Sequence, residues 1–323
     1  MSKYIGRRVE AAIGLESSRG VGVAPTRSLG KVDFSVYDKT VDVRDDSGIG
    51  RIEDSNARYV VEKYAQGQIG GYLGANSAGY LLALAFGSAP DIGIVSDSVY
   101  PWTIAVANTN QHKSASLLVK DANLTLIHKL MMLHQLEISV GMEDPVKFTA
   151  EFISKVGKGS TQSIPAYVED YKFTKRKTKI YLASDVSGLA AATRTSIKSL
   201  TLTISKNLVR DSAIGTVEPE DILNQQLTIE GEIKLNYSDQ TVKNLMLNGT
   251  FNAMRIKMES EKLIGSTTYG DMTIDLSKVD FFSWEPESKN DDIVTNKINF
   301  KANYDLSNGM LNAATVHNAL AAV

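Results

Sequence analysis

Val-Arg-Asp-Asp-Ser-Gly-Ile-Gly, residues 43–50, returns in shortened form as Val-Arg-Asp-Ser-Ala-Ile-Gly-Thr at residues 209–216. The arginines of the two copies, Arg44 and Arg210, are 166 positions apart (210 − 44), about half of the 323-residue chain. A repeat of this length exceeds the roughly 20–50 residues of a solenoid unit and has the size of a domain. The sequence therefore predicts two tandem copies of one domain.

The order of elements around the two copies agrees. Each copy follows a run in which apolar and polar residues alternate, 32–37 and 200–205, and such a period predicts a half-buried strand. A long strand, a short helix that ends at Gly87 or Gly249, and three further strands follow in each half. The expected fold is mainly β with short helices, divided into an N-terminal arm (1–30), a first domain (31–160), a linker with a basic strand (161–195), a second domain (196–306) and a C-terminal tail (307–323).

The composition excludes several classes of protein. Hydrophobic residues make up 43% and charged residues 22%, which is ordinary for globular domains. A net charge of −2 argues against a protein that grips nucleic acid through a basic surface. The absence of cysteine excludes disulfides, zinc–thiolate sites and cysteine nucleophiles. No run approaches the ~18–20 apolar residues of a membrane span, so we expect a soluble protein made in a cytosol, with no membrane partner.

Nothing in the sequence builds an active site. We predict no catalytic residue, no cofactor and no metal site, because no nucleophile elbow, phosphate-binding loop or metal-ligand spacing is present. His128 and His134 could share a strand face, and the acidic loop after Asp42 could take calcium, but neither has the spacing of a known ligand set.

Two polar loops, 38–57 and 206–225, contain the repeated motif. Loops near twenty residues are uncommon in compact domains and usually have a function. We predict that they contact neighbouring subunits or the next ring of an assembly, through Arg44, Asp45, Asp46, Glu53, Asp54, Arg210, Asp211, Glu218, Glu220 and Asp221.

The basic strand at 171–181 is the one local charge anomaly. Lys175, Lys177 and Lys179 would share one face of it. Three interpretations stay open: a nucleic-acid site, an edge strand guarded by lysines, or a surface that pairs with an acidic neighbour.

The first half resembles the tail tube proteins of long-tailed bacteriophages, of the non-contractile, siphovirus-like kind. The resemblance is carried by Gly-Leu-Glu-Ser-Ser-Arg-Gly-Val-Gly-Val-Ala-Pro (14–25), Val-Asp-Phe-Ser-Val (32–36), Asp-Asp-Ser-Gly-Ile-Gly-Arg-Ile-Glu-Asp-Ser (45–55), Gly-Gly-Tyr-Leu-Gly (70–74) and the helix at 80–87. Residues 200–304 are similar to the same domain more loosely.

The resemblance implies a virion protein that is made in the host cytoplasm. Each half would be a tail-tube-like β-sandwich or half-barrel, and rings with a continuous inner β-barrel would stack into a tube through which DNA is ejected. Single-domain members form hexameric rings, so the duplication implies trimers with pseudo-sixfold symmetry. The implied partners are the chain itself, the tail tip or baseplate, the tail terminator, the tape measure protein and passing DNA. The predicted lumen-facing residues are Gln66, Gln68, Glu230, Glu232, Lys234 and Asn236.

Other functions remain as alternatives. One is a different ring-forming virion protein or a secretion tube, and another is a capsid decoration protein. A cell-wall hydrolase would need a cleft with paired carboxylates, and a binding module would stay monomeric at high concentration.

Overall fold

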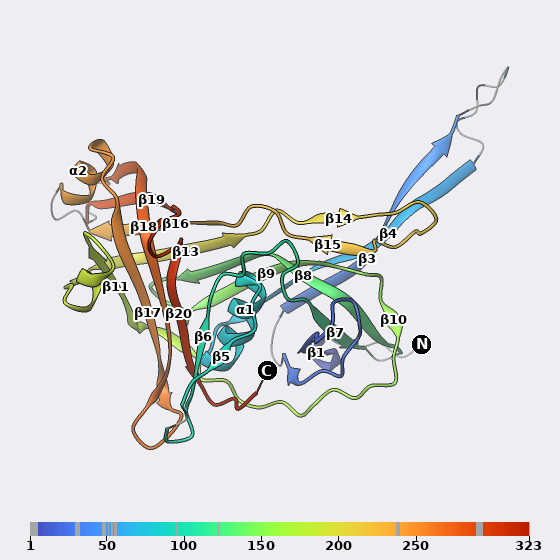
Figure 1. The fold of residues 1–323 in the computed structure, drawn as a ribbon, viewed down its shortest axis with the longest axis horizontal. Helices are drawn as coiled ribbons and strands as arrows, with labels where there is room; N and C mark the ends of the chain where they lie inside the picture. The colour runs from blue at the N-terminus through green and yellow to red at the C-terminus, as the bar shows by residue number, and fades with distance from the viewer. Residues whose placement is uncertain are drawn as a thin grey trace.

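The computed structural model describes residues 6–29, 33–46, 50, 52, 54, 57–94, 96–121, 123–236, 240–288 and 293–322. Among these residues the chain is mainly β-strand with two α-helices, as predicted (Figure 1). The first half contains a 3-10 turn (Gly6–Arg8), β1 (Glu10–Leu15), β2 (Arg27–Ser28), β3 (Asp33–Asp45), β4 (Ala57–Tyr72), α1 (Ala75–Phe86), β5 (Asp91–Ile92), β6 (Tyr100–Ile104), β7 (Ala115–Lys120), β8 (Thr125–Val140), β9 (Lys147–Ser154) and β10 (Lys158–Gly159).

The second half follows after an extended segment. It contains β11 (Phe173–Ala183), a 3-10 turn (Ser187–Ala190), β12 (Arg194–Thr195), β13 (Ile197–Ser205), β14 (Val209–Asp211), β15 (Asp221–Leu223), β16 (Thr228–Asn236), α2 (Thr241–Leu247), β17 (Asn252–Leu263), β18 (Tyr269–Glu287), β19 (Thr295–Ala302) and β20 (Leu311–Asn318).

One antiparallel sheet runs through both halves. Its strands are hydrogen-bonded in the order β3–β4–β9–β8–β13–β16–β19–β18. The junction between the halves is the pairing of β8 with β13, from Val140 opposite Leu200 to Gln135 opposite Ser205. One face of this sheet is apolar and packs into the core, and the other face is polar, as the alternation of the strands requires.

The two halves pair their strands in the same order. β1–β7–β8–β9–β4–β3 in the first half corresponds to β11–β17–β18–β19–β16–β13 in the second. A β-bulge lies at His134 in β8, beside β9, and at Phe282 in β18, beside β19. Because a bulge is a specific local feature, its recurrence at the same place is strong evidence that the two sheets have the same plan.

A glycine and a phenylalanine mark the same point in each sheet. Gly67 lies opposite Phe152, and Gly231 lies opposite Phe300. A Cβ on Gly67 would be 2.3 Å from the carbonyl oxygen of Ser35 and 2.7 Å from the Phe152 ring. A Cβ on Gly231 would meet a carbonyl oxygen and a phenylalanine ring in the same way, at 2.3 and 2.5 Å. The glycines leave the space that the buried aromatic rings fill.

The helices differ in their surroundings although they occupy the same place in the order. α1 is buried along all but one of its residues, and it ends at Gly87 in the left-handed conformation, as predicted. Asp170, from the segment between the halves, accepts hydrogen bonds from the N–H groups of Asn76 and Ser77 at 2.8 and 3.1 Å and so caps α1. No residue of α2 is fully buried, because α2 covers the sheet from outside.

Several segments have a secondary structure other than the one predicted. The described part of the expected arm contains β1, which pairs with β7 and buries Ile13. The basic strand of the expected linker is β11, which pairs with β17 as part of the second sheet. The expected C-terminal tail contains β20, which pairs with β18 and with β6. Residues 38–45 of the expected loop at 38–57 belong to β3, which pairs with β4.

The glycine–phenylalanine contacts give a test of the fold. We expect Gly67→Ala and Gly231→Ala each to lower the free energy of unfolding by about 1–3 kcal/mol, because the added methyl group must displace backbone or a packed ring. Urea denaturation measures the effect. Gly141→Ala, where no atom lies within 4 Å of the new methyl group, is the matched control. Equal stability of all three variants would contradict the packing described.

Candidate assembly surfaces

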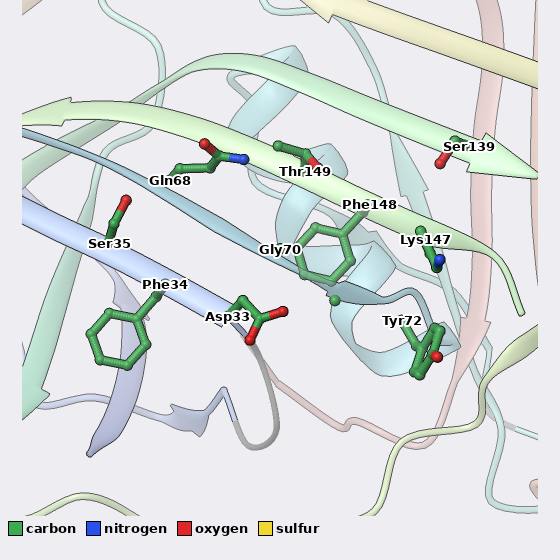
Figure 2. Close-up of a pocket in the computed structure, with 11 residues that line it drawn as sticks. Asp33, Phe34, Ser35, Gln68, Gly70, Tyr72, Ser139, Lys147, Phe148 and Thr149 are labelled. Atoms are coloured by element: carbon green, nitrogen blue, oxygen red, sulfur yellow. The ribbon is translucent and has the colours of Figure 1, made fainter. Parts of the chain in front are cut away.

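The polar face of the continuous sheet is the largest surface shared by both halves. The strand registers place all six predicted lumen-facing residues on this face, including Gln68 in β4 and Glu232 in β16. One row of opposed residues runs from Asp33 in β3 to Lys301 in β19. A hollow of about 620 Å³ lies on this face at Gly70, because glycine has no side chain to fill the space (Figure 2).

Charges on the polar face are paired across neighbouring strands. Lys301 Nζ lies 2.7 Å from a Glu230 carboxylate oxygen, and Lys297 Nζ lies 2.9 Å from Glu232. Lys234 pairs with Glu287. These groups are 34–47% exposed, so each pair contributes at most about 1 kcal/mol to stability. The face is therefore closer to neutral than its glutamates alone suggest.

Carboxylates still outnumber lysines on this face. The carboxylates are Asp33, Glu137, Glu151, Glu230, Glu232, Asp280, Glu285 and Glu287, and the lysines are Lys39, Lys147, Lys234, Lys297 and Lys301. The sequences of β8, β9, β13, β16 and β19 contain no arginine.

The hairpin of β3 and β4 projects from the rest of the molecule (Figure 1). A bulge at Val41 and Asp42 separates its base from its outer part. Val43 and Tyr59, which lie opposite each other in the outer part, are 55% and 59% exposed. Arg44 and Asp46 are exposed and Asp45 is half-buried; Asp54 is described as exposed, whereas Glu53 lies outside the described residues. The outer part of the hairpin therefore presents apolar side chains that the described residues leave about half exposed.

The equivalent hairpin of the second half, β14–β15, is docked on the first half. The Arg210 guanidinium lies 2.7 Å from the Glu62 carboxylate and 4.0 Å from the centre of the Tyr64 ring. The N–H of Lys63 donates to the carbonyl of Val217 at 2.5 Å. Arg210 therefore has contacts within the chain, and so do Glu218 and Asp221, which form ion pairs with Lys158 and Arg19. Asp211 and Glu220 lie at the end of the same hairpin, where Glu220 N–H donates to the Asp211 carbonyl.

Arg19 is the residue that fastens this hairpin, and the sequence analysis did not single it out. Its guanidinium donates to the Asp221 carboxylate at 2.5 Å, to the Ile222 carbonyl at 2.7 Å and to the carbonyl of His112. The loop that carries Arg19 is held by Glu16, a buried carboxylate that accepts from Gly20 N–H, two serine hydroxyls and Leu130 N–H. In the sequence, Glu16 and Arg19 are only three residues apart in a glycine-rich stretch, and this spacing alone does not predict that they hold a distant hairpin.

Lys206 lies buried where the second hairpin leaves the sheet. Its ammonium donates to the carbonyl of Leu84 at the end of α1. Burial, with a smaller contribution from the Arg19 guanidinium, lowers the pKa of Lys206 to about 7. Burial also lowers the pKa of His112 to about 4, so this ring is neutral near pH 7 and its Nε2 donates to the Ala107 carbonyl at 2.9 Å. Lys206 and Arg19 therefore lie close together beside the point where the chain bends at Asn207, which has a φ of 48°.

The basic strand is β11, and its pairing leaves one side largely open. β11 pairs with β17 along most of its length, and on the other side only Ile180 and Tyr181 pair, with β12. Lys177 lies over the Tyr269 ring at 3.1 Å from its centre. This placement agrees with an edge strand that lysines protect, and the other two interpretations of its charge remain predictions.

Two further features are absent from the described residues. No group of three or more histidine or acidic side chains there is arranged to hold a metal ion. Of the helices that the structure describes, none has the length and apolar character of a membrane span.

Lys206 makes the stability of the folded chain depend on pH. Between about pH 7 and pH 10 the folded chain has released the Lys206 proton while the unfolded chain still binds it, so the free energy of unfolding should rise with pH in this window. We expect Lys206→Met to abolish this rise and to be more stable than the unchanged chain at pH 6, by about 1–3 kcal/mol. Urea denaturation at pH 6, 8 and 10 measures both effects, with Lys175→Met, at an exposed position, as the control. Parallel pH profiles for all three proteins would contradict a buried ammonium.

Comparison with known protein families agrees with the architecture. A search among curated proteins gave no match. The family model described as phage tail tube protein matches residues 6–302, which is nearly the whole chain and includes both halves of the continuous sheet. This is a structural family and not an enzyme family, and its members are components of the virion tail. The chain therefore belongs to the phage tail tube protein family.

Proposed function

We propose that this chain forms rings that stack into the tail tube of a non-contractile, siphovirus-like phage and that the viral DNA is ejected through the lumen. The observation that supports this most is the continuous sheet, whose polar face crosses both halves without interruption. A sheet with open edges at both ends is completed when copies join edge to edge into a closed barrel, which removes the edges. The matching pairing order of the halves supports their origin as two copies of one domain.

The number of strands favours three chains in each ring. Each chain supplies the eight strands from β3 to β18 in the order given above, so three chains would supply about 24. With strands about 4.8 Å apart and tilted by about 40°, the barrel circumference is about 150 Å and its diameter about 48 Å. Side chains on the inner face narrow this bore, and the lumen that remains is still wide enough for a DNA duplex to pass. Six chains would double the diameter to about 96 Å, far more than DNA requires.

The polar face has the electrostatic character that a DNA duct needs. A basic wall would release counterions from DNA and hold the duplex, with a binding constant that falls steeply with salt. Here lysines such as Lys297 and Lys301 are paired with glutamates and are outnumbered by carboxylates. The wall therefore offers phosphates no unopposed cluster of cations. Passing DNA and a tape measure protein would occupy such a lumen without specific binding.

The β3–β4 hairpin is the best candidate for contacts beyond one chain. Its outer apolar side, with Val43, Tyr59 and Val61 each about half exposed, would be buried against a neighbouring subunit or the next ring. The same stacking would place tail tip and terminator proteins at the two ends of the tube. Synthesis in the host cytoplasm before assembly follows from the same role.

Electron microscopy of the purified protein at high concentration tests the proposal. We expect hollow tubes or rings whose end-on averages contain three chains with a near-sixfold outline. Replacing residues 43–59 by Asn-Gly joins Asp42 to Val60, which lie opposite each other, and removes the outer hairpin without changing the sheet. This variant should fold but not form tubes. If the unchanged protein stays monomeric even when tail tips are added to start polymerisation, the tube proposal is contradicted. If the variant forms normal tubes, the role of the outer hairpin is contradicted.

The lumen assignment predicts a change in ejection without a change in assembly. Glu230→Lys with Glu232→Lys places four lysines together where two ion pairs were, so we expect intact tubes but DNA ejection slower by about tenfold or more at low salt. The measurement is DNA release from phage particles that carry both substitutions. Glu230→Gln with Glu232→Gln is the matched control and should have a smaller effect. Unchanged ejection by the lysine variant would place these residues outside the lumen.

A further inference from the structure

The continuous sheet ends in two strand edges that have no partner strand within the described residues. Among the described residues, β3 pairs only with β4, and the other side of β3 is open. Beyond Val279, β18 pairs only with β19. An open edge carries unpaired N–H and C=O groups and is a template for another strand. The two edges belong to opposite ends of the same sheet, so a second copy of this chain is the partner that satisfies both.

The junction inside the chain shows how these edges can pair. β13 corresponds to β3 in the pairing order, and β8 corresponds to β18. The glycine and bulge positions fix the alignment residue by residue: Thr201 takes the place of Ser35, and Phe282 takes the place of His134. Within the chain, Thr203 lies opposite Glu137 and Thr201 lies opposite Ser139.

We propose that β3 of one chain adds to β18 of a second copy in the register that joins β13 to β8 within each chain. Transfer of that register places Tyr37 opposite the second copy's Glu285, Ser35 opposite Glu287 and Lys39 opposite Ser283. The polar face continues across the junction, and Lys39 comes diagonally next to Glu285, an opposite charge within reach. This inference rests on the proposed ring and specifies how its subunits join.

The transferred junction is expected to be weaker than the one inside the chain. On the core side, Leu202 opposite Ile138 within the chain corresponds to Val36 opposite Pro286 between chains. Proline in a sheet is confined to edge strands and bulges, because it has no N–H, so one hydrogen bond is missing wherever its nitrogen faces the partner. A smaller apolar contact and fewer hydrogen bonds suit a junction that forms only on assembly.

Cysteine cross-linking tests the register, and the chain has no cysteine of its own. The test pair is Tyr37→Cys with Glu285→Cys, in one chain, oxidised during assembly and examined on a non-reducing gel. Residues directly opposite each other have Cα atoms about 4.5–5.5 Å apart, within the range that a disulfide spans, whereas diagonal positions are about 7–8 Å apart. Tyr37→Cys with Ser283→Cys is therefore the register control. Glu137→Cys with Thr203→Cys, which lie opposite within the chain, calibrates oxidation and should cross-link without joining chains.

We expect the test pair to give covalent dimers and closed trimers, at least tenfold more than the register control. Hollow tubes in which the test pair stays uncross-linked, while the calibration pair reacts, would overturn the register and leave the tube function intact. Equal cross-linking of the test pair and the register control would also overturn it. Covalent trimers that never form tubes would support the register and overturn the tube. Monomers with neither cross-links nor tubes would overturn both.

Discussion

The backbone ladder between β8 and β13 is the interaction on which the rest of this structure depends. It runs from Val140 opposite Leu200 to Gln135 opposite Ser205, and it turns two sheets into one. Without it each half would expose a strand edge whose polar groups need a partner. Because side chains alternate along every strand, the ladder also fixes which residues of the two halves share a face. The polar residues of both halves form one surface because β8 and β13 pair in this register.

The same junction explains why two hairpins of similar sequence behave differently. β13 ends beside β8, so its hairpin meets the first half and bends onto it at Asn207, with Leu208 and Ile222 packed against Met132. Lys206 is buried by this bend although its pKa falls to about 7, so the contact carries an electrostatic cost. The docked hairpin offsets that cost with apolar burial and with the Arg19 and Arg210 hydrogen bonds. β14–β15 contacts the β3–β4 hairpin at Glu62, Lys63 and Tyr64, whereas Val43 and Tyr59, farther out, stay more than half exposed.

Local pattern predicted much of the fold, and non-local pairing accounts for what it missed. The strand periods, the long strands and the helix end at Gly87 depend on nearby residues and were confirmed. β1 was missed because its partner β7 lies about one hundred positions away. β20 was missed because it lies between β18, about forty positions away, and β6, about two hundred positions away, and the sequence of a short strand does not identify its partners. Residues 38–45 were predicted as part of a loop because Val41 and Val43 face solvent, so the usual contrast between an apolar and a polar side is absent there. The six residues predicted to face the lumen share one face of the sheet because a period of two assigns a face, but the lysines in β19 that pair with the glutamates among them required the register; their place in a lumen stays a prediction.

In the proposed ring, the pairing of the two halves within one chain would change how the ring assembles. The junction between β8 and β13 buries Leu202, Ile204, Leu136 and Ile138, so it can form as the chain folds and does not depend on protein concentration. In a ring of six separate domains all six junctions would require encounters between molecules, whereas three duplicated chains leave three. Each remaining junction can then be weaker, because fewer of them must form together and because closure of the ring makes the last one intramolecular. In that proposal, a less apolar edge such as that of β18 at Pro286 would also protect the free subunit from open-ended strand addition before assembly.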